Sequence, residues 1–288
     1  MLRSWRDRTL PAAALLAPAL VIFAAFSFYP MWRIVWLGFH QQNRTGTRQR
    51  WVGPDQYVDG LTGDEFRDGL WITTQFVLLT VPLGVLLGVV LALAANQRLR
   101  GIGIFRLIFS STIASSSAVT AVVFFVLLEP SVGYVSDPWI FDLLDPDRAI
   151  YAVALTGVWQ NLGLTFIITL AGLQAVPDDV LEAARLDGFG PIRTFVRITL
   201  PLLGPTMLFL SVALTVFGLQ AFAQIDVLTG GGPAGSTEVL VFKIFDRQDP
   251  VHLGEGSVMS VGLLTVSYTH LTLPTKESRG SGRGSRSH

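Results

Sequence analysis

The sequence predicts an all-α integral membrane protein with about six transmembrane helices, and three observations support this. Of its 288 residues, 50% are hydrophobic and 15% are charged, whereas soluble domains usually carry about 25% charged residues. The uncharged residues gather in runs long enough for a helix to cross a bilayer, and the mean hydropathy is +0.51. Between two of these runs, residues 177–201 form a polar island with the pattern of a helix–turn–helix.

The apolar runs define the expected spans in order. We expect spans at 10–39, 70–95, 105–128, 150–173 and 202–225. A sixth span begins near Gly256, but its apolar pattern stops at about Val266, so the last helix is predicted to be truncated. Residues 266–288 are rich in serine, glycine and arginine, and we expect a disordered or non-native tail. Its VSYTHLTLPT segment back-translates to a sequence that resembles a transposon-type sequencing adapter; a frameshift or an unusual native tail are the alternatives.

Basic residues set the predicted orientation. Residues 1–8 contain three arginines, and residues 96–106 contain three arginines and no acid, whereas the loop at 129–148 is acidic. Positively charged loops stay in the cytoplasm, so the N-terminus is predicted to be cytoplasmic. Counting spans from there also places residues 177–201 in the cytoplasm.

The polar island has its own helix signals. Pro177 suits the first turn of a helix, where a missing N–H group costs nothing. Gly188 is the expected stop, because a C-terminal cap needs a positive φ angle. Pro191 can open a second short helix, and Pro201 is expected to end it. A compact helical element of this kind indicates a docking device.

Residues of the island resemble a known family. They are Glu182, Ala183, Ala184, Asp187, Gly188, Ile198, Leu200 and Pro201. Their spacing resembles the EAA loop of bacterial ABC-importer membrane subunits, and EAARLDG followed by ITLP is most similar to the permeases of binding-protein-dependent sugar importers. The WVGPDQY segment from Trp51 and the LTGGGP segment from Leu228 resemble loops of the same permeases.

The resemblance implies a fold, a function and partners. It implies a permease domain over 1–265 with a core over 70–265, in the bacterial inner membrane. It implies a translocation pathway for a sugar, formed with a second permease, two ATP-binding subunits and an extracytoplasmic substrate-binding protein. In that family the loop docks on the ATPase; here Glu182 and Asp187 would make polar contacts or brace the loop, and Ala183 and Ala184 would allow close approach.

Polar residues within the spans are the candidates for the pathway. Trp159, Gln160 and Asn161 lie about 10 residues into the fourth span, which is near mid-depth at helical rise. An aromatic face with neighbouring amides suits a sugar, and Gln220 and Gln224 in the fifth span are further candidates. The serines at 115–117 and Thr120 are weaker ones. The alternative is that these groups bond helix to helix.

Several classes of function are disfavoured. The chain has no cysteine, its four histidines have no metal-ligand spacing, and neither lysine lies in a P-loop. We therefore expect no catalytic residue, metal or cofactor, and ATP hydrolysis on another subunit. The spans after the first carry no central charge, which disfavours a proton- or sodium-coupled carrier. A permease for another small solute (amino acid, peptide or polyol), a channel and a secondary carrier remain the alternatives.

Overall fold

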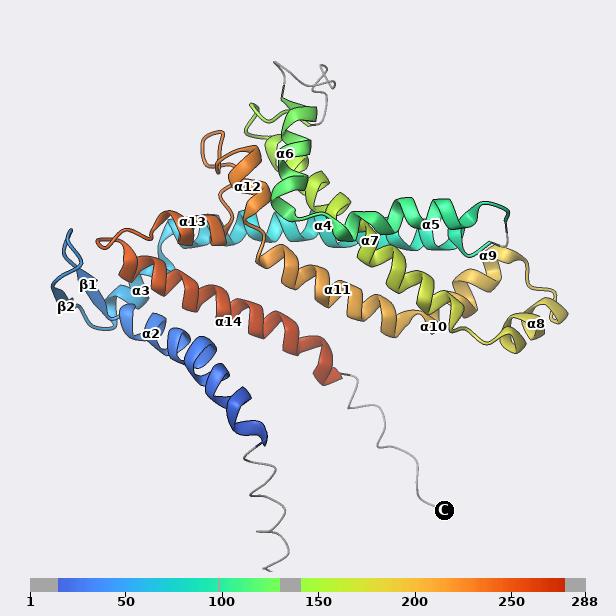
Figure 1. Ribbon diagram of the computed structural model, residues 1–288, viewed down its shortest axis with the longest axis horizontal. Coiled ribbons are helices and arrows are strands. Elements are labelled where there is room, and N and C mark those ends of the chain that lie inside the picture. Colours follow the sequence, from blue (N-terminus) through green and yellow to red (C-terminus); the bar gives the residue numbers. More distant parts are fainter. Residues whose placement is uncertain (1–14, 98, 130–140, 278–288) are drawn as a thin grey trace, which may run out of the picture. The chain divides into compact units, whose positions relative to one another are not determined.

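The computed structural model describes residues 15–97, 99–129 and 141–277, and nearly all regular structure in these ranges is helical (Figure 1). The predicted features that fall on residues 1–14, 98, 130–140 and 278–288 lie outside the described residues. The chain forms two compact units. The first comprises residues up to Arg67 together with Ile244–Tyr268, and the second comprises Asp68–Lys243 and the chain from Thr269.

The first unit combines helices with a short hairpin. Its elements are a helix over Leu15–Leu37 that contains η1 (Ala24–Phe28) and α2 (Tyr29–Leu37), β1 (His40–Gln42), β2 (Gln49–Trp51), α3 (Asp55–Thr62), the first turn of α4 (Asp64–Ala95) and most of α14 (Leu253–Glu277). The strands are antiparallel, with His40 opposite Trp51. The Phe39 ring stacks on Trp51 with centroids 5.3 Å apart, and the Tyr57 hydroxyl donates to the Val35 carbonyl at 2.7 Å. These contacts anchor the hairpin and α3 to the end of α2.

The second unit contains the remaining helices. They are most of α4, α5 (Ile102–Ser110), η2 (Ser111–Ala114), α6 (Ser117–Leu128), α7 (Ala149–Gln174), α8 (Asp178–Leu186), α9 (Pro191–Thr194), η3 (Phe195–Thr199), α10 (Leu200–Leu202), α11 (Gly204–Leu219), α12 (Ala223–Leu228) and the beginning of α13 (Leu240–Asp246).

Among the described residues, three helices are long and apolar enough to cross a membrane. They are Leu15–Leu37, Asp64–Ala95 and Ala149–Gln174. Two bent pairs, Ile102–Ala114 with Ser117–Leu128 and Pro191–Leu202 with Gly204–Leu219, raise the number to five if each pair is one span. The structure thus has an all-α membrane architecture with three to five candidate spans, against the six that the sequence predicts.

The third predicted span is not a continuous helix. Its two halves meet at an angle of 107°, because Ser115 and Ser116 have extended backbone angles (ψ 133° and 153°) (Figure 1). The Ser116 hydroxyl accepts a hydrogen bond from the Val119 N–H at 3.3 Å and so caps α6. Hydroxyl groups of this kind satisfy backbone groups that a break in a membrane helix sets free.

The second helix of the island ends one residue after Pro201, close to where the sequence predicts. The helix continues to Leu202, and the chain turns by 64° before α11 begins at Gly204. Pro201 follows the π-helical turn η3, where the hydrogen-bond register is already altered, so its missing N–H is tolerated. The fifth predicted span also ends early, because α11 stops at Leu219.

Helix α14 differs from the disorder that the sequence predicts beyond Val266. Its backbone is helical from Leu253 to Glu277. Helix propagation from an existing helix costs little per residue, which accounts for a helical state that polar composition alone does not predict.

Helix α7 lies at the centre of the second unit. Val153 is fully buried, and Phe166 is 1% exposed. The N-terminal half of α7 packs in a cluster with Phe76 of α4 and Ile225 of α12. The C-terminal half packs in a second cluster with Leu203. The surrounding helices are therefore held in place by their contacts with α7.

Candidate functional site

A cleft of about 420 Å³ opens in the second unit where α6, α7 and the junction between α11 and α12 meet. Gln160 and Asn161 enter it from α7, and Gln220 and Gln224 enter it from the junction. The structure thus brings together four of the five residues that the sequence singled out for a pathway. Ser117, at the start of α6, completes the polar part of the lining.

A break in the fifth span shapes this cleft. Helix α11 ends at Leu219 and α12 begins at Ala223, and Phe222 between them has φ −129° and ψ −57°, which is not helical. The Gln220 N–H is still bonded to the Val216 carbonyl at 3.2 Å. Irregular backbone at membrane depth is tolerated only where protein buries it or where it lines a cavity. The position of the break beside the polar side chains fits the second case.

A direct amide pair joins the two sides of the cleft. Gln224 Nε2 donates to Gln160 Oε1 at 2.8 Å, and Gln224 is only 7% exposed. Asn161 Nδ2 donates to the Gly157 carbonyl of its own helix at 2.9 Å. The side chains are thereby held in fixed orientations, with donor and acceptor groups gathered at one place.

Trp159 does not line the cleft. Its ring packs edge-on against Phe124 of α6, with centroids 5.7 Å apart. Successive residues on a helix point about 100° apart. Gln160 and Asn161 both line the cleft, and Trp159 points about 200° away from Asn161, toward α6. The aromatic lining comes from Phe217 and Phe222 instead. Sequence reasoning missed these two because nothing distinguishes them from lipid-facing phenylalanines, except that they flank Gln220.

The polar island forms a second candidate site. Helix α8 ends at Leu186, and Gly188 follows with φ +77°, as the sequence predicts. The Phe189 N–H donates to the Ala184 carbonyl and the Gly188 N–H to the Arg185 carbonyl, both at 3.0 Å. This is the pattern by which a left-handed residue satisfies the last carbonyls of a helix. It fixes the angle at which the chain leaves α8.

The predicted motif residues of the island differ in exposure. Glu182, Ala183, Asp187, Gly188, Leu200 and Pro201 are exposed, Ile198 is half-buried and Ala184 is buried. Ala184 therefore packs within its own chain, and Ala183 is the exposed member of the alanine pair.

The most exposed apolar side chains of the island are not in the motif. Leu186 is 89% exposed and Ile192 is 79% exposed. A shallow groove of about 540 Å³ runs along α9 and η3 between Ile192 and Val196, with Arg193 and Arg197 on its walls. The Arg193 guanidinium also lies 4.0 Å over the Phe189 ring. Exposed apolar patches rimmed by polar residues are typical of surfaces that contact a protein or a membrane.

Comparison with known proteins identifies the family. The model of the family described as "Binding-protein-dependent transport system inner membrane component" matches residues 84–272. This range contains both the cleft and the polar island. The chain belongs to this family.

Two relatives match most of the length of this chain. The sn-glycerol-3-phosphate transport system permease protein UgpA of Agrobacterium fabrum is 31% identical over 264 residues, which cover 88% of this chain and 89% of the relative. The trehalose/maltose transport system permease protein MalF of Thermococcus litoralis is 30% identical over 266 residues, which cover 88% and 90%. Both relatives are transport permeases, and this chain is a permease subunit of the same kind.

A solved structure shares the fold. A bacterial ABC transporter involved in the import of the acidic polysaccharide alginate contains a chain that matches with a TM-score of 0.80 and 22% identity, covering 98% of this chain and 100% of that chain. At this identity the match shows the fold of the permease alone.

Proposed function

We propose that this chain is the membrane-spanning permease subunit of an ATP-driven importer, and that it forms the translocation pathway for a sugar or sugar derivative with a second permease. The observation that carries the proposal is the match to transport permeases over 88% of the chain. The names of the relatives give a phosphorylated polyol or disaccharides as their substrates. These substrates share several hydroxyl groups, so we expect a polyhydroxylated solute here. An importer for another small solute, such as an amino acid or peptide, is the second candidate.

The cleft favours an uncharged sugar within that class. Its polar lining consists of amides and one hydroxyl, and no Arg, Lys or His is among the described residues that line it. A phosphate group needs cationic or charge-assisted donors, whereas sugar hydroxyls pair well with neutral amides. Phe217 and Phe222 supply apolar faces for the C–H surface of a sugar ring. Gln160, Asn161, Gln220 and Gln224 are thus proposed to contact the solute, with Trp159 in a packing role.

The polar island is proposed to couple this subunit to an ATP-binding subunit in the cytoplasm. The positive-inside rule supports a cytoplasmic N-terminus and a cytoplasmic island. The exposed Leu186 and Ile192 offer apolar area to a groove of the partner, and Glu182 and Asp187 lie exposed for polar contacts. The rest of the assembly is proposed to be a second permease, two ATP-binding subunits and an extracytoplasmic substrate-binding protein.

The pathway assignment is tested by uptake assays in proteoliposomes that contain the whole complex. The probes are radiolabelled maltose, trehalose and sn-glycerol 3-phosphate. Gln224→Leu removes an amide that is proposed to contact the solute, so we expect the half-saturating concentration of the transported sugar to rise about tenfold, since one hydrogen bond contributes about 0.5–1.5 kcal/mol. Gln174→Leu is the matched control, because Gln174 is exposed at the other end of α7. Equal behaviour of the two variants contradicts the assignment.

The coupling assignment has its own test. Leu186→Asp changes a side chain that is 89% exposed, so it leaves the fold of the permease intact. We expect it to abolish co-purification of the ATP-binding subunits. Val58→Asp in α3 is the control, with a side chain that is 59% exposed outside the island. A Leu186→Asp permease that still retains the ATP-binding subunits shows that the island is not the docking element.

A further inference from the structure

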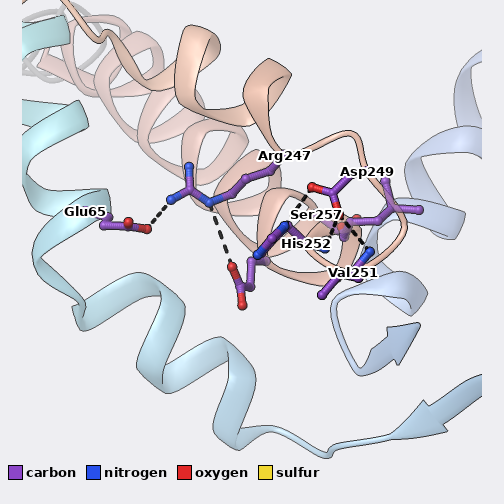
Figure 2. Close-up of polar contacts among 8 residues, drawn as sticks. Glu65, Arg247, Asp249, Val251, His252 and Ser257 are labelled. Atoms are coloured by element: carbon purple, nitrogen blue, oxygen red, sulfur yellow. Dashed lines mark hydrogen bonds and ion pairs between the residues drawn. The ribbon is translucent and has the colours of Figure 1, made fainter. Parts of the chain in front are cut away.

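Arg247 connects three segments of the first unit (Figure 2). It follows α13, and its side chain is only 15% exposed. Its Nη2 atom pairs with Oε2 of Glu65 in the first turn of α4. Its Nε atom lies 3.8 Å from Oε2 of Glu255 in the first turn of α14. One mostly buried guanidinium therefore lies between the beginnings of two long helices.

The backbone of Arg247 is seated against α14. A Cβ atom at Gly256 would lie 3.1 Å from the Cβ atom and 3.2 Å from the carbonyl oxygen of Arg247, so glycine allows this close approach. Arg247 is thus fixed on the α14 side by packing, and its guanidinium reaches out from there to Glu65. Apolar contacts such as Phe66 near Gly262 also hold α14 and the start of α4 together, so the ion pair sets the register of this contact and is not its only support.

The two paired residues lie beside the points where the chain passes from one unit to the other. The units divide between Arg67 and Asp68 and between Lys243 and Ile244. Glu65 lies two residues before Arg67, and Arg247 lies three residues after Ile244. Within the first unit, the ion pair therefore joins two segments that each continue into the second unit: the start of α4 and the segment after α13.

The same two connections are joined again within the second unit. The Leu240 N–H at the start of α13 donates to the buried Thr73 hydroxyl of α4 at 2.8 Å. A Cβ atom at Gly69 would lie 3.0 Å from Cδ of Lys243, so α13 and α4 also touch there. The start of α4 is thus bound to α13 within the second unit and to Arg247, which follows α13, within the first unit.

We propose that Arg247 is a positioning residue that clamps the start of α4 to the segment between α13 and α14, so that both connections move as one piece during transport. The inference rests on the proposed function, because it assigns the clamp to the transport cycle of an importer. A largely buried charge is held close to its partners, and only the Glu65 carboxylate, of the two that Arg247 pairs with, belongs to α4. Closely packed elements transmit strain to one another. If the segment that holds Arg247 moves, the start of α4 is therefore expected to move with it.

The first experiment compares two neighbouring carboxylates in the full complex. Glu65→Gln removes the charge that Arg247 pairs with, and we expect uptake to fall about tenfold at an unchanged amount of complex in the membrane, a size typical of coupling between contacting residues. Asp64→Asn is the matched control in the same turn. Asp64 is 94% exposed and lies 3.9 Å from the exposed Arg67, and pairs of that kind contribute little. Equal uptake by the two variants overturns the proposal.

The second experiment replaces the ion pair by a covalent link. The chain contains no cysteine, so E65C/R247C introduces the only two thiols of this subunit, in a complex whose other subunits are cysteine-free. Glutamate and arginine span more than a disulfide can, so bis-methanethiosulfonate linkers of graded length are used. We expect the doubly substituted complex to lose uptake, to regain it when a linker of matching length joins the two thiols, and to lose it again on treatment with dithiothreitol. A role in folding alone would not give this reversible response.

Single-cysteine complexes treated with the same reagents control for modification without bridging. A linked E65C/R247C complex that stays inactive overturns the clamp, because a rigid link should then replace the ion pair. Failure of the proposed function is distinguishable from failure of the clamp. If the chain is not an importer permease, the unsubstituted complex shows no uptake of maltose, trehalose or sn-glycerol 3-phosphate before any variant is tested.

Discussion

The crossing of α7 with the segment before the bend of the third span is tight enough to predict the effect of one methyl group. The Gly163 N–H of α7 donates to the Thr112 hydroxyl of η2 at 2.7 Å. A Cβ atom at Gly163 would lie 2.5 Å from that hydroxyl oxygen, 2.9 Å from the Ile113 nitrogen and 3.1 Å from the Phe109 carbonyl oxygen. Two of these three atoms belong to the backbone, so a rotamer change cannot remove the clash. We predict that Gly163→Ala forces α7 and η2 apart.

The magnitude follows from three contributions. Overpacking costs about 1–3 kcal/mol, and loss of the hydrogen bond to Thr112 costs about 1 kcal/mol. The better helix propensity of alanine returns about 1 kcal/mol. The net loss of stability is about 1–3 kcal/mol, which lowers Tm by roughly 2–4 °C for each kcal/mol in a chain of this size.

The assay is thermal unfolding of the purified permease in detergent. Gly103→Ala is the matched control, because Gly103 lies in α5 and has no atom within 4 Å of an added Cβ. We expect Gly103→Ala to leave Tm unchanged or slightly raised. Thr112→Ala in the Gly163→Ala background removes the nearest atom and should restore part of the lost Tm, whereas the contact with the Ile113 nitrogen remains. A Gly163→Ala protein with the Tm of the Gly103→Ala control refutes the reasoning.

Three further predictions concern the loops and the cleft. Gly188→Ala should lower stability by about 1 kcal/mol, because φ is +77° there, and Gly190→Ala (φ −71°) should cost little; thermal unfolding of both variants checks this. The hydrogen bond between His252 and Asp249 raises the pKa of His252 and lowers the pKa of Asp249, so this pair should stabilise the turn before α14 at mildly acidic pH. That stabilisation should fade as pH rises through the raised pKa of His252, and also as pH falls through the lowered pKa of Asp249. The difference in Tm between the wild type and His252→Gln, followed across pH, measures this stabilisation. Gln224→Glu should lower uptake of a neutral sugar, because it puts a charge at a 7% exposed site; unchanged uptake would contradict a pathway role.

Long apolar runs and local helix signals could be predicted from the sequence. The runs around α4 and α7 predict two helices that the structure contains, because an uncharged stretch of this length has few stable states other than a membrane helix. Gly188 has the positive φ angle that its place after α8 predicts, because a helix C-cap depends on local geometry alone. These features depend on residues that are close in sequence.

Features that depend on tertiary contacts could not be predicted. The 107° bend at Ser115 and Ser116 is hidden in an apolar run, because serines are common in membrane helices and do not by themselves mark a break. Gln160 and Gln224 were both candidates, but their hydrogen bond depends on how α7 and α12 pack. The burial of Ala184 and the exposure of Leu186 were missed, because motif spacing does not show which face of α8 meets the rest of the chain.

The central claim is tested most directly by uptake into proteoliposomes that contain this permease with its partner permease and ATP-binding subunits. Radiolabelled maltose and trehalose are supplied outside with the substrate-binding protein, and ATP or a non-hydrolysable analogue is enclosed inside. The account predicts accumulation of sugar above the external concentration only when hydrolysable ATP and the binding protein are both present. Equilibration of sugar without ATP, or uptake that does not depend on the binding protein, would contradict it and favour a channel or a secondary carrier.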